Sequence, residues 1–177
     1  VLFGDVNPGG RLPVTFYTAD QAMPAFDDYA MEGRTYRYFR GEPLYPFGHG
    51  LSYTRFHYRR LRTDTRTVSP DGRLRIEVDV ANTGKRAGEE VVQLYVRRLK
   101  SRPGDPRQDL RGFLRVSLAP GERRRVAFDL SPQTALRKYD DASNGYVVPA
   151  GRYEVRVGGS STDARLRARF KVRSPRD

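Results

Sequence analysis

Apolar and polar residues alternate along most of the chain from residue 73 onward. A period of two residues is typical of a β-strand that buries one face and exposes the other. The apolar positions of these alternations are Leu74, Ile76, Val78 and Val80, then Val92, Leu94 and Val96, then Val126, Phe128 and Leu130, and finally Tyr153, Val155 and Val157. Val91 and Tyr95 add apolar groups to the second face of one strand, so we expect that face to be partly covered.

Turn signals separate these strands. Residues 82–84 (Asn-Thr-Gly) suit a turn with positive φ, and residues 119–122 (Ala-Pro-Gly-Glu) place Pro and Gly where a type II turn favours them. Residues 102–108 predict a polar loop and residues 148–151 another turn, while residues 110–118 are extended in character. About seven short strands over about 115 residues predict an antiparallel β-sandwich, without a helix in that part of the chain.

The first 56 residues follow a different pattern. Residues 1–3 are an apolar run typical of a short strand, residues 7–10 (Asn-Pro-Gly-Gly) predict a turn, and residues 12–17 predict a second strand. Ten of the 20 aromatic residues fall between Phe26 and Tyr58, together with several Pro and Gly. A flexible spacer would be polar and poor in aromatic residues. We therefore expect this aromatic segment to be an ordered connection that packs against a domain surface.

The composition is that of a folded protein. Of the 177 residues, 37% are hydrophobic and 31% are charged, which excludes a wholly disordered chain. The chain has no cysteine, so disulfides and cysteine-based metal or nucleophile chemistry are excluded. No apolar run approaches the roughly 20 residues that span a bilayer, and we expect no membrane span.

The formal net charge of +12 is unevenly distributed. Residues 1–56 carry five arginines against six acids, whereas residues 57–177 carry 28 basic residues against 15 acids. Near the C-terminus basic residues alternate with apolar ones, and the basic positions are Arg165, Arg167, Arg169, Lys171 and Arg173. This pattern indicates a strand with a basic outer face, and such charge protects a sheet edge from aggregation. No nucleic-acid-binding motif accompanies it, so we expect no nucleic-acid partner.

Few side chains suggest catalysis or metal binding. His49 and His57 lack the paired spacing of a zinc site, so we expect structural roles for them and no metal. Ser52, His49 and Asp5 could form a triad only in space, and no Gly-x-Ser-x-Gly elbow exposes the serine. Residues 7–11 are glycine-rich, but no Lys followed by Ser or Thr completes a phosphate-binding loop.

Three pairs of adjacent acids could supply carboxylates, namely Asp27 with Asp28, Glu89 with Glu90, and Asp140 with Asp141. Glycoside hydrolysis needs two carboxyl groups that tertiary structure places across a sugar, and sequence neighbours do not meet that need. The tyrosines could stack on sugar rings, but the chain has no Trp and turns interrupt the aromatic cluster. We therefore expect the acid pairs to be non-catalytic and the aromatic residues to pack between domains.

Several longer motifs, taken in order, resemble one known family. Residues 3–16 (FGDVNPGGRLPVTF), 34–39 (RTYRYF) and 45–54 (YPFGHGLSYT) resemble the C-terminal part of family 3 glycoside hydrolases, which include bacterial β-glucosidases and β-xylosidases. The following motifs resemble the fibronectin type III-like domain that ends those enzymes: residues 82–84 (NTG), 87–96 (AGEEVVQLYV), 110–122 (LRGFLRVSLAPGE) and 148–160 (VPAGRYEVRVGGS). The resemblance covers nearly the whole chain.

The resemblance implies a mainly β chain in two parts. Residues 1–56 would be the C-terminal remnant of the family's α/β sandwich domain together with the aromatic segment. Residues 57–177 would be a fibronectin type III-like, and hence immunoglobulin-like, antiparallel β-sandwich. The chain begins at Val1 rather than Met, so we expect a fragment of a larger enzyme.

The resemblance also implies a retaining, exo-acting β-glycosidase that releases terminal β-D-glucosyl or β-D-xylosyl residues. In the family, the nucleophilic aspartate and the acid/base residue both precede the part resembled here. We therefore assign no catalytic residue, substrate-binding residue, metal or cofactor to this chain, and expect it to be inactive alone. Its partners would be the missing N-terminal catalytic domains and, through them, a β-linked glycoside. The family suggests a periplasmic or secreted enzyme.

A second interpretation comes from a different functional class. The chain could be a stand-alone basic β-sandwich that binds polysaccharide or another anionic surface. Salt-sensitive retention on such polymers, lost when Arg165, Arg167 and Arg169 are neutralised, would distinguish this hypothesis from the first.

Overall fold

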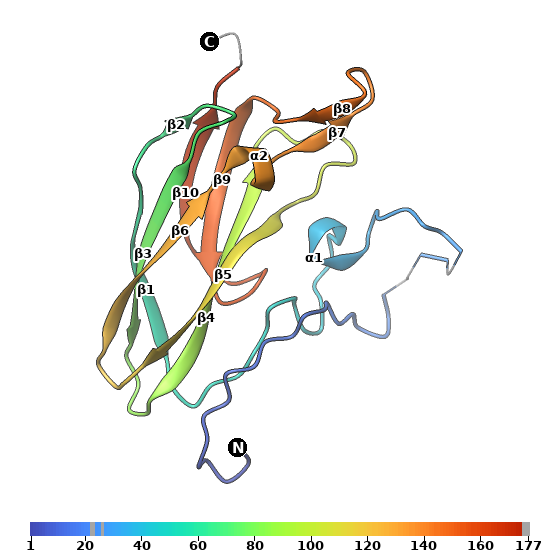
Figure 1. The fold of residues 1–177 in the computed structure, drawn as a ribbon. Coiled ribbons are helices and arrows are strands. Elements are labelled where there is room, and N and C mark those ends of the chain that lie inside the picture. The colour runs from blue at the N-terminus through green and yellow to red at the C-terminus, as the bar shows by residue number, and fades with distance from the viewer. Residues whose placement is uncertain (22–23, 26, 175–177) are drawn as a thin grey trace.

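The computed structural model describes residues 1–21, 24–25 and 27–174 of the chain. These residues form a β-sandwich preceded by a segment with little regular secondary structure (Figure 1). The strands are β1 (Phe56–Thr63), β2 (Thr67–Val68), β3 (Leu74–Asn82), β4 (Gly88–Arg98), β5 (Asp109–Leu118), β6 (Arg123–Leu130), β7 (Lys138–Asp140), β8 (Gly145–Val147), β9 (Gly151–Gly158) and β10 (Ala164–Val172). Two single-turn helices, α1 (Thr35–Tyr38) and α2 (Pro132–Ala135), complete the elements.

Two sheets face each other in the sandwich. One has the strand order β1-β3-β6 and the other has the order β2-β10-β9-β4-β5, while β7 and β8 form a separate hairpin. Neighbouring strands are antiparallel, except that β2 is parallel to β10. The predicted fold class, a mainly β chain with an antiparallel sandwich, is confirmed.

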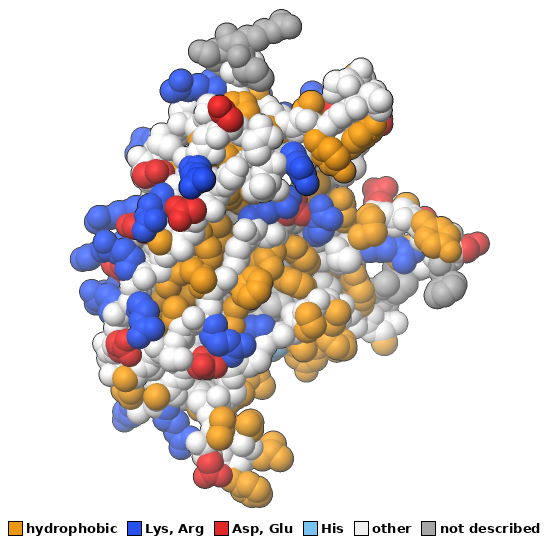
Figure 2. All heavy atoms as spheres, in the orientation of Figure 1, with side chains coloured by type: hydrophobic (Ala, Val, Ile, Leu, Met, Phe, Trp, Pro, Cys, Tyr) orange, Lys and Arg blue, Asp and Glu red, His pale blue; other side chains and the backbone are white. Residues whose placement is uncertain are grey.

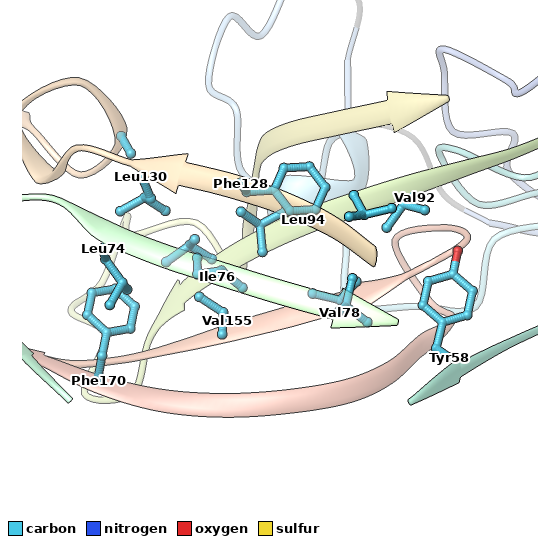
Figure 3. Close-up of a cluster of buried hydrophobic side chains, with 14 of the residues drawn as sticks. Tyr58, Leu74, Ile76, Val78, Val92, Leu94, Phe128, Leu130, Val155 and Phe170 are labelled. Atoms are coloured by element: carbon cyan, nitrogen blue, oxygen red, sulfur yellow. The ribbon is translucent and has the colours of Figure 1, made fainter. Parts of the chain in front are cut away.

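The core lies between the sheets and is built from the alternating apolar positions. Leu74, Ile76, Val78 and Val80 of β3 are all 0% exposed. They pack with the inward side chains of β4, β9 and β10 in one cluster, which Figure 3 shows between the two sheets. The predicted two-residue alternation therefore identified the core-facing side chains of β3, β4, β6 and β9 correctly.

The predicted turns are partly confirmed. At residues 119–122 Gly121 has φ 76° and the Glu122 N–H donates to Ala119 at 3.0 Å, as a type II turn requires. The positive φ predicted at residues 82–84 is wrong, because none of these residues has one. Asn82 ends β3 with its side chain fully buried, and its amide holds the turn together. Its Oδ1 accepts from Thr54 Oγ1 (2.6 Å) and the Gly84 N–H (3.0 Å).

Two strand predictions in the first part are wrong. Residues 1–3 form a turn, and residues 12–17 make only one isolated bridge, from Phe16 to Tyr45. Residue 13 is a proline and cannot donate a backbone hydrogen bond, which prevents a continuous ladder there. The backbone of this segment instead forms separate hydrogen bonds with residues 45–49. For example, the Leu12 N–H donates to the His49 carbonyl at 2.8 Å.

The absence of a helix after residue 57 was also predicted wrongly. The stretch between β6 and β9 contains α2 and the β7–β8 hairpin. Pro132 occupies the first turn of α2, where its missing N–H costs nothing. Elements of three or four residues are too short for hydrophobic periodicity to reveal them.

Candidate functional site

A contact surface lies between residues 1–55 and the outer face of the five-stranded sheet. Figure 1 shows this N-terminal segment and α1 beside β4 and β5. The outward side chains of β4 at Val91, Gln93 and Tyr95 are only 7%, 3% and 1% exposed. The second face of β4 is therefore covered, as predicted.

Gln93 is the central contact of this surface. Its Nε2 donates to the carbonyl oxygens of Gly48 (3.2 Å) and Gly159 (2.5 Å), and its Oε1 accepts from the Tyr95 hydroxyl (2.5 Å). Gly48 has φ 81°, and a Cβ there would lie 2.1 Å from Gln93 Oε1. Only glycine permits both the backbone conformation and this close approach.

Aromatic side chains fill the space beside Gln93. Tyr36 of α1 stacks on Phe47 with ring centroids 4.4 Å apart and meets Tyr95 edge-on at 5.8 Å. The Tyr36 hydroxyl accepts a hydrogen bond from the Leu110 N–H at 3.1 Å. Burial raises the pKa of both Tyr36 and Tyr95. The expectation that the aromatic segment packs against a domain surface is met by Tyr36 and Phe47, whereas Phe26 lies outside the described residues.

A buried ion pair joins the N-terminal segment to the end of the sandwich. Arg11 Nη2 lies 2.6 Å from Glu90 Oε2, and the two side chains are 13% and 3% exposed. The Tyr58 hydroxyl donates to the other oxygen of Glu90 at 2.6 Å. Burial, and then the charge of Glu90, raise the pKa of Tyr58. The Arg165 guanidinium lies over the Tyr58 ring, 4.7 Å from its centroid.

Further polar contacts anchor both ends of the segment. Asn7 Nδ2 donates to the Ala87 carbonyl at 2.9 Å, while its Oδ1 accepts from the Tyr53 N–H at 2.8 Å. Arg37 forms an ion pair with Asp109. The segment is thus fixed to the sandwich from its first turn to α1, although it contributes no strand to either sheet among the residues that the structure describes.

The histidines and the serine considered for catalysis each make local contacts. His49 packs on the Tyr45 ring at 5.2 Å, and His57 Nδ1 accepts from Arg59 Nε at 3.0 Å. Ser52 Oγ donates to Asn7 Oδ1 at 3.1 Å rather than to a histidine. Within the described part of the chain, no group of three His, Asp or Glu side chains could hold a metal ion. The same residues contain no helix long and apolar enough to cross a bilayer.

The three acid pairs each have a local explanation. Glu89 and Glu90 point to opposite faces of β4, because Glu89 bonds Arg115 (2.7 Å) whereas Glu90 bonds Arg11. Asp140 accepts from Ser143 Oγ at 2.8 Å in the β7–β8 turn. The other members of the pairs, Asp27, Asp28 and Asp141, are exposed.

The basic side chains of β10 lie on its outer face, as the alternation of basic and apolar residues predicted. Arg165 pairs with Asp163 at 2.8 Å, and Arg169 lies 3.8 Å from Glu154. The short strand β2 pairs only with Lys171 and Val172, so the rest of β10 forms the sheet edge. The basic side chains therefore lie on an edge strand, where charge protects a sheet from aggregation.

Sequence reasoning missed the importance of Gln93 and of the Arg11–Glu90 pair. Glu90 had a usable signal, because it occupies the same register as the core residues Val92 and Leu94. A carboxylate at a core position needs a buried partner. Nothing in a single sequence indicates that Arg11, 79 residues earlier, supplies that partner.

Two family models match the chain, in the same order along the sequence as the motifs described above. Residues 1–53 match the model of the glycosyl hydrolase family 3 C-terminal domain. Residues 90–161 match the model of the fibronectin type III-like domain. Both matches agree with the resemblance drawn from the sequence motifs.

Curated relatives extend the similarity over almost the full chain. A xylan 1,4-β-xylosidase from Xylanibacter ruminicola is 43% identical over 168 residues, which is 94% of this chain and 19% of the relative. Thermostable β-glucosidase B from Acetivibrio thermocellus is 37% identical and covers 98% of this chain and 25% of its own length. The chain therefore spans about a fifth to a quarter of the length of these relatives.

Solved structures agree with the sequence matches. A β-glucosidase from Kluyveromyces marxianus superposes with a TM-score of 0.84 at 36% identity, over 98% of this chain and 22% of its own. A β-glucosidase from Streptomyces venezuelae gives a TM-score of 0.83 at 33% identity, over 97% of this chain and 24% of its own. The chain corresponds to the C-terminal part of family 3 glycoside hydrolases, including their fibronectin type III-like domain.

Proposed function

We propose that this chain is the C-terminal structural part of a retaining, exo-acting β-glycosidase acting on terminal β-D-glucosyl or β-D-xylosyl residues. In this proposal the chain stabilises the domains that carry the catalytic carboxylates and supplies no catalytic residue itself. The domain division is part of the proposal, with residues 1–56 completing the preceding domain and residues 57–177 forming the buttressing sandwich. The start of β1 at Phe56 and the family match that ends at residue 53 support this division.

The exposure of apolar side chains in the first 53 residues carries the proposal. Of the seventeen large hydrophobic side chains exposed among the described residues, twelve lie in this segment. Leu2 and Phe3 are 92% and 95% exposed, and Figure 2 shows hydrophobic side chains gathered at the N-terminal end of the molecule. Large apolar side chains left exposed in one segment are typical of an interface. In this proposal the partner is the preceding part of a family 3 enzyme.

Two variants test the proposal. Leu2→Asp and Phe3→Asp place a charge on side chains that the 177-residue chain leaves in water. We expect little change in the Tm of the isolated chain and a clear fall in the Tm of the full glycosidase, because the charge would be buried there. Equal Tm shifts in both proteins would contradict the proposed interface. Hydrolysis of aryl β-glucosides and β-xylosides should occur in the full protein and not in the chain alone.

A further inference from the structure

A polar groove lies between α1, the end of β4 and the loop that follows it. Its volume is about 440 Å³, within the range of small-ligand sites. Arginine side chains dominate its lining, and these are Arg40, Arg97, Arg98, Arg102, Arg107 and Arg156. Asp105 is the one acid among its described lining residues. The N-terminal segment forms one wall through Thr15, Phe39 and Pro43, so the groove exists only in the assembled chain.

The nearby acids leave much of this positive charge uncompensated. Asp105 is already shared between Lys138 (2.9 Å) and Arg98 (3.8 Å). Glu154, just outside the groove, is shared among Arg97 (2.9 Å), Arg156 (3.9 Å) and Arg169 (3.8 Å). Among the described residues, no acid lies within ion-pair distance of Arg40 or Arg102, whose side chains are exposed.

Two residues that line the groove, Thr15 and Arg156, each have a buried polar atom without a hydrogen bond to a described residue. The Arg156 side chain is 17% exposed, and its Nη1 donates to Gln108 at 2.6 Å, yet its Nε is buried without a hydrogen bond to any described residue. Thr15 Oγ1 is also buried and unpartnered among the described residues. Burial and the charges of Arg167 and Arg97 lower the pKa of Arg156. Unsatisfied buried polar groups are rare in folded proteins, and both of these belong to residues of the arginine-rich lining.

We propose that this groove binds a small oxyanion, a carboxylate or phosphate group, between Arg156 and the exposed guanidiniums of Arg40 and Arg102. A planar guanidinium presents a fork of N–H donors that matches both groups. The anion would accept hydrogen bonds from these guanidinium groups and would offset the local excess of positive charge. This inference does not depend on the proposed role in a glycosidase.

The test is a titration of the 177-residue chain at constant ionic strength. Inorganic phosphate and glucuronate are the two probes, glucose is the uncharged control of similar size, and sodium chloride balances the salt. We expect saturable binding by calorimetry for at least one anion and none for glucose. The Arg156 Nε–H resonance should shift on titration, whereas that of Arg123 should not. Preference for glucuronate would identify an acidic-sugar site, and preference for phosphate a phosphate site.

Matched variants separate a site from general charge attraction. The double variant Arg40→Ala with Arg102→Ala removes two exposed side chains that make no described hydrogen bond. We expect it to weaken binding by about tenfold or more. The control, Arg73→Ala with Arg123→Ala, removes the same charge elsewhere on the surface. Equal weakening by both pairs, or no saturable binding of either anion with an unmoved Arg156 resonance, would overturn the proposal.

Discussion

The carbonyl oxygen of Gly48 accepts a hydrogen bond from the Gln93 side chain, and no side chain fits between the two residues. Gly48 belongs to the segment that matches the family 3 C-terminal domain, whereas Gln93 lies on β4 within the fibronectin type III-like match. This contact joins the two parts of the chain at the buried outer face of the five-stranded sheet. Its geometry depends on a positive φ and on the absence of a Cβ.

Gly48→Ala should detach the N-terminal segment. The methyl group would clash with Gln93 in addition to straining the backbone, and we expect a loss of about 1–3 kcal/mol in the free energy of unfolding. Gly121→Ala is the control, because Gly121 has a similar φ of 76° but no described atom lies within 4 Å of the position that an added Cβ would take. Proteolysis should cleave residues 1–55 faster in the first variant only. Equal sensitivity of both variants would show that backbone strain alone is responsible.

Arg11→Met should destabilise the chain by leaving the Glu90 carboxylate buried without its cation. Loss of one partner of a buried pair costs about 3–5 kcal/mol, measurable by urea unfolding. The double variant Arg11→Met with Glu90→Gln removes the unpaired charge, so it should recover part of the loss. A double variant as unstable as the sum of both single variants would contradict the coupling between these side chains.

Asn82→Ala should be among the most damaging single changes in the sandwich. The Asn82 amide accepts from Thr54 and Gly84 and donates to the carbonyls of Arg86 (2.7 Å) and Leu118 (3.0 Å). Removing it leaves several buried polar groups without partners, at about 1–3 kcal/mol each before relaxation. Thermal unfolding should show a Tm far lower than that of Thr83→Ala, whose side chain makes one exposed bond.

Alkaline pH should destabilise the chain through Tyr58. Its pKa is raised in the folded state above the ordinary value of 10.0, so its contribution to stability is full below pH 10. Above that pH the unfolded state loses the Tyr58 proton while the folded state keeps it, and the free energy of unfolding falls. Tyr58→Phe should flatten this fall, measured by urea unfolding across the alkaline range. An unchanged slope would assign the effect to other tyrosines.

The sandwich was predictable because alternate apolar side chains of β3, β4, β6 and β9 are buried in one core. In β3 every second residue from Leu74 to Val80 is apolar and fully buried, so a single period revealed both the strand and its orientation. The N-terminal segment gave no such signal. Its apolar side chains at Leu2 and Phe3 are exposed. Its backbone forms isolated hydrogen bonds instead of a ladder; for example, the Phe47 carbonyl accepts from the Ser161 N–H.

The contact surface was predictable only in part. The extra apolar groups at Val91 and Tyr95 indicated that the second face of β4 is covered, but they did not identify what covers it. Gln93 lies between them, and a glutamine in an outward register is ordinary for an exposed face. Its burial follows from a segment 45 residues earlier in the chain, which periodicity along one strand cannot detect.

The mass of the native protein tests the central claim most directly. An antibody raised against the 177-residue chain would detect the protein in extracts of its source. The account predicts a band about four to five times larger than 20.2 kDa, because the chain covers 19–25% of its curated relatives. A native band near 20 kDa would contradict a glycosidase with catalytic domains on the same polypeptide, and would favour a stand-alone binding module.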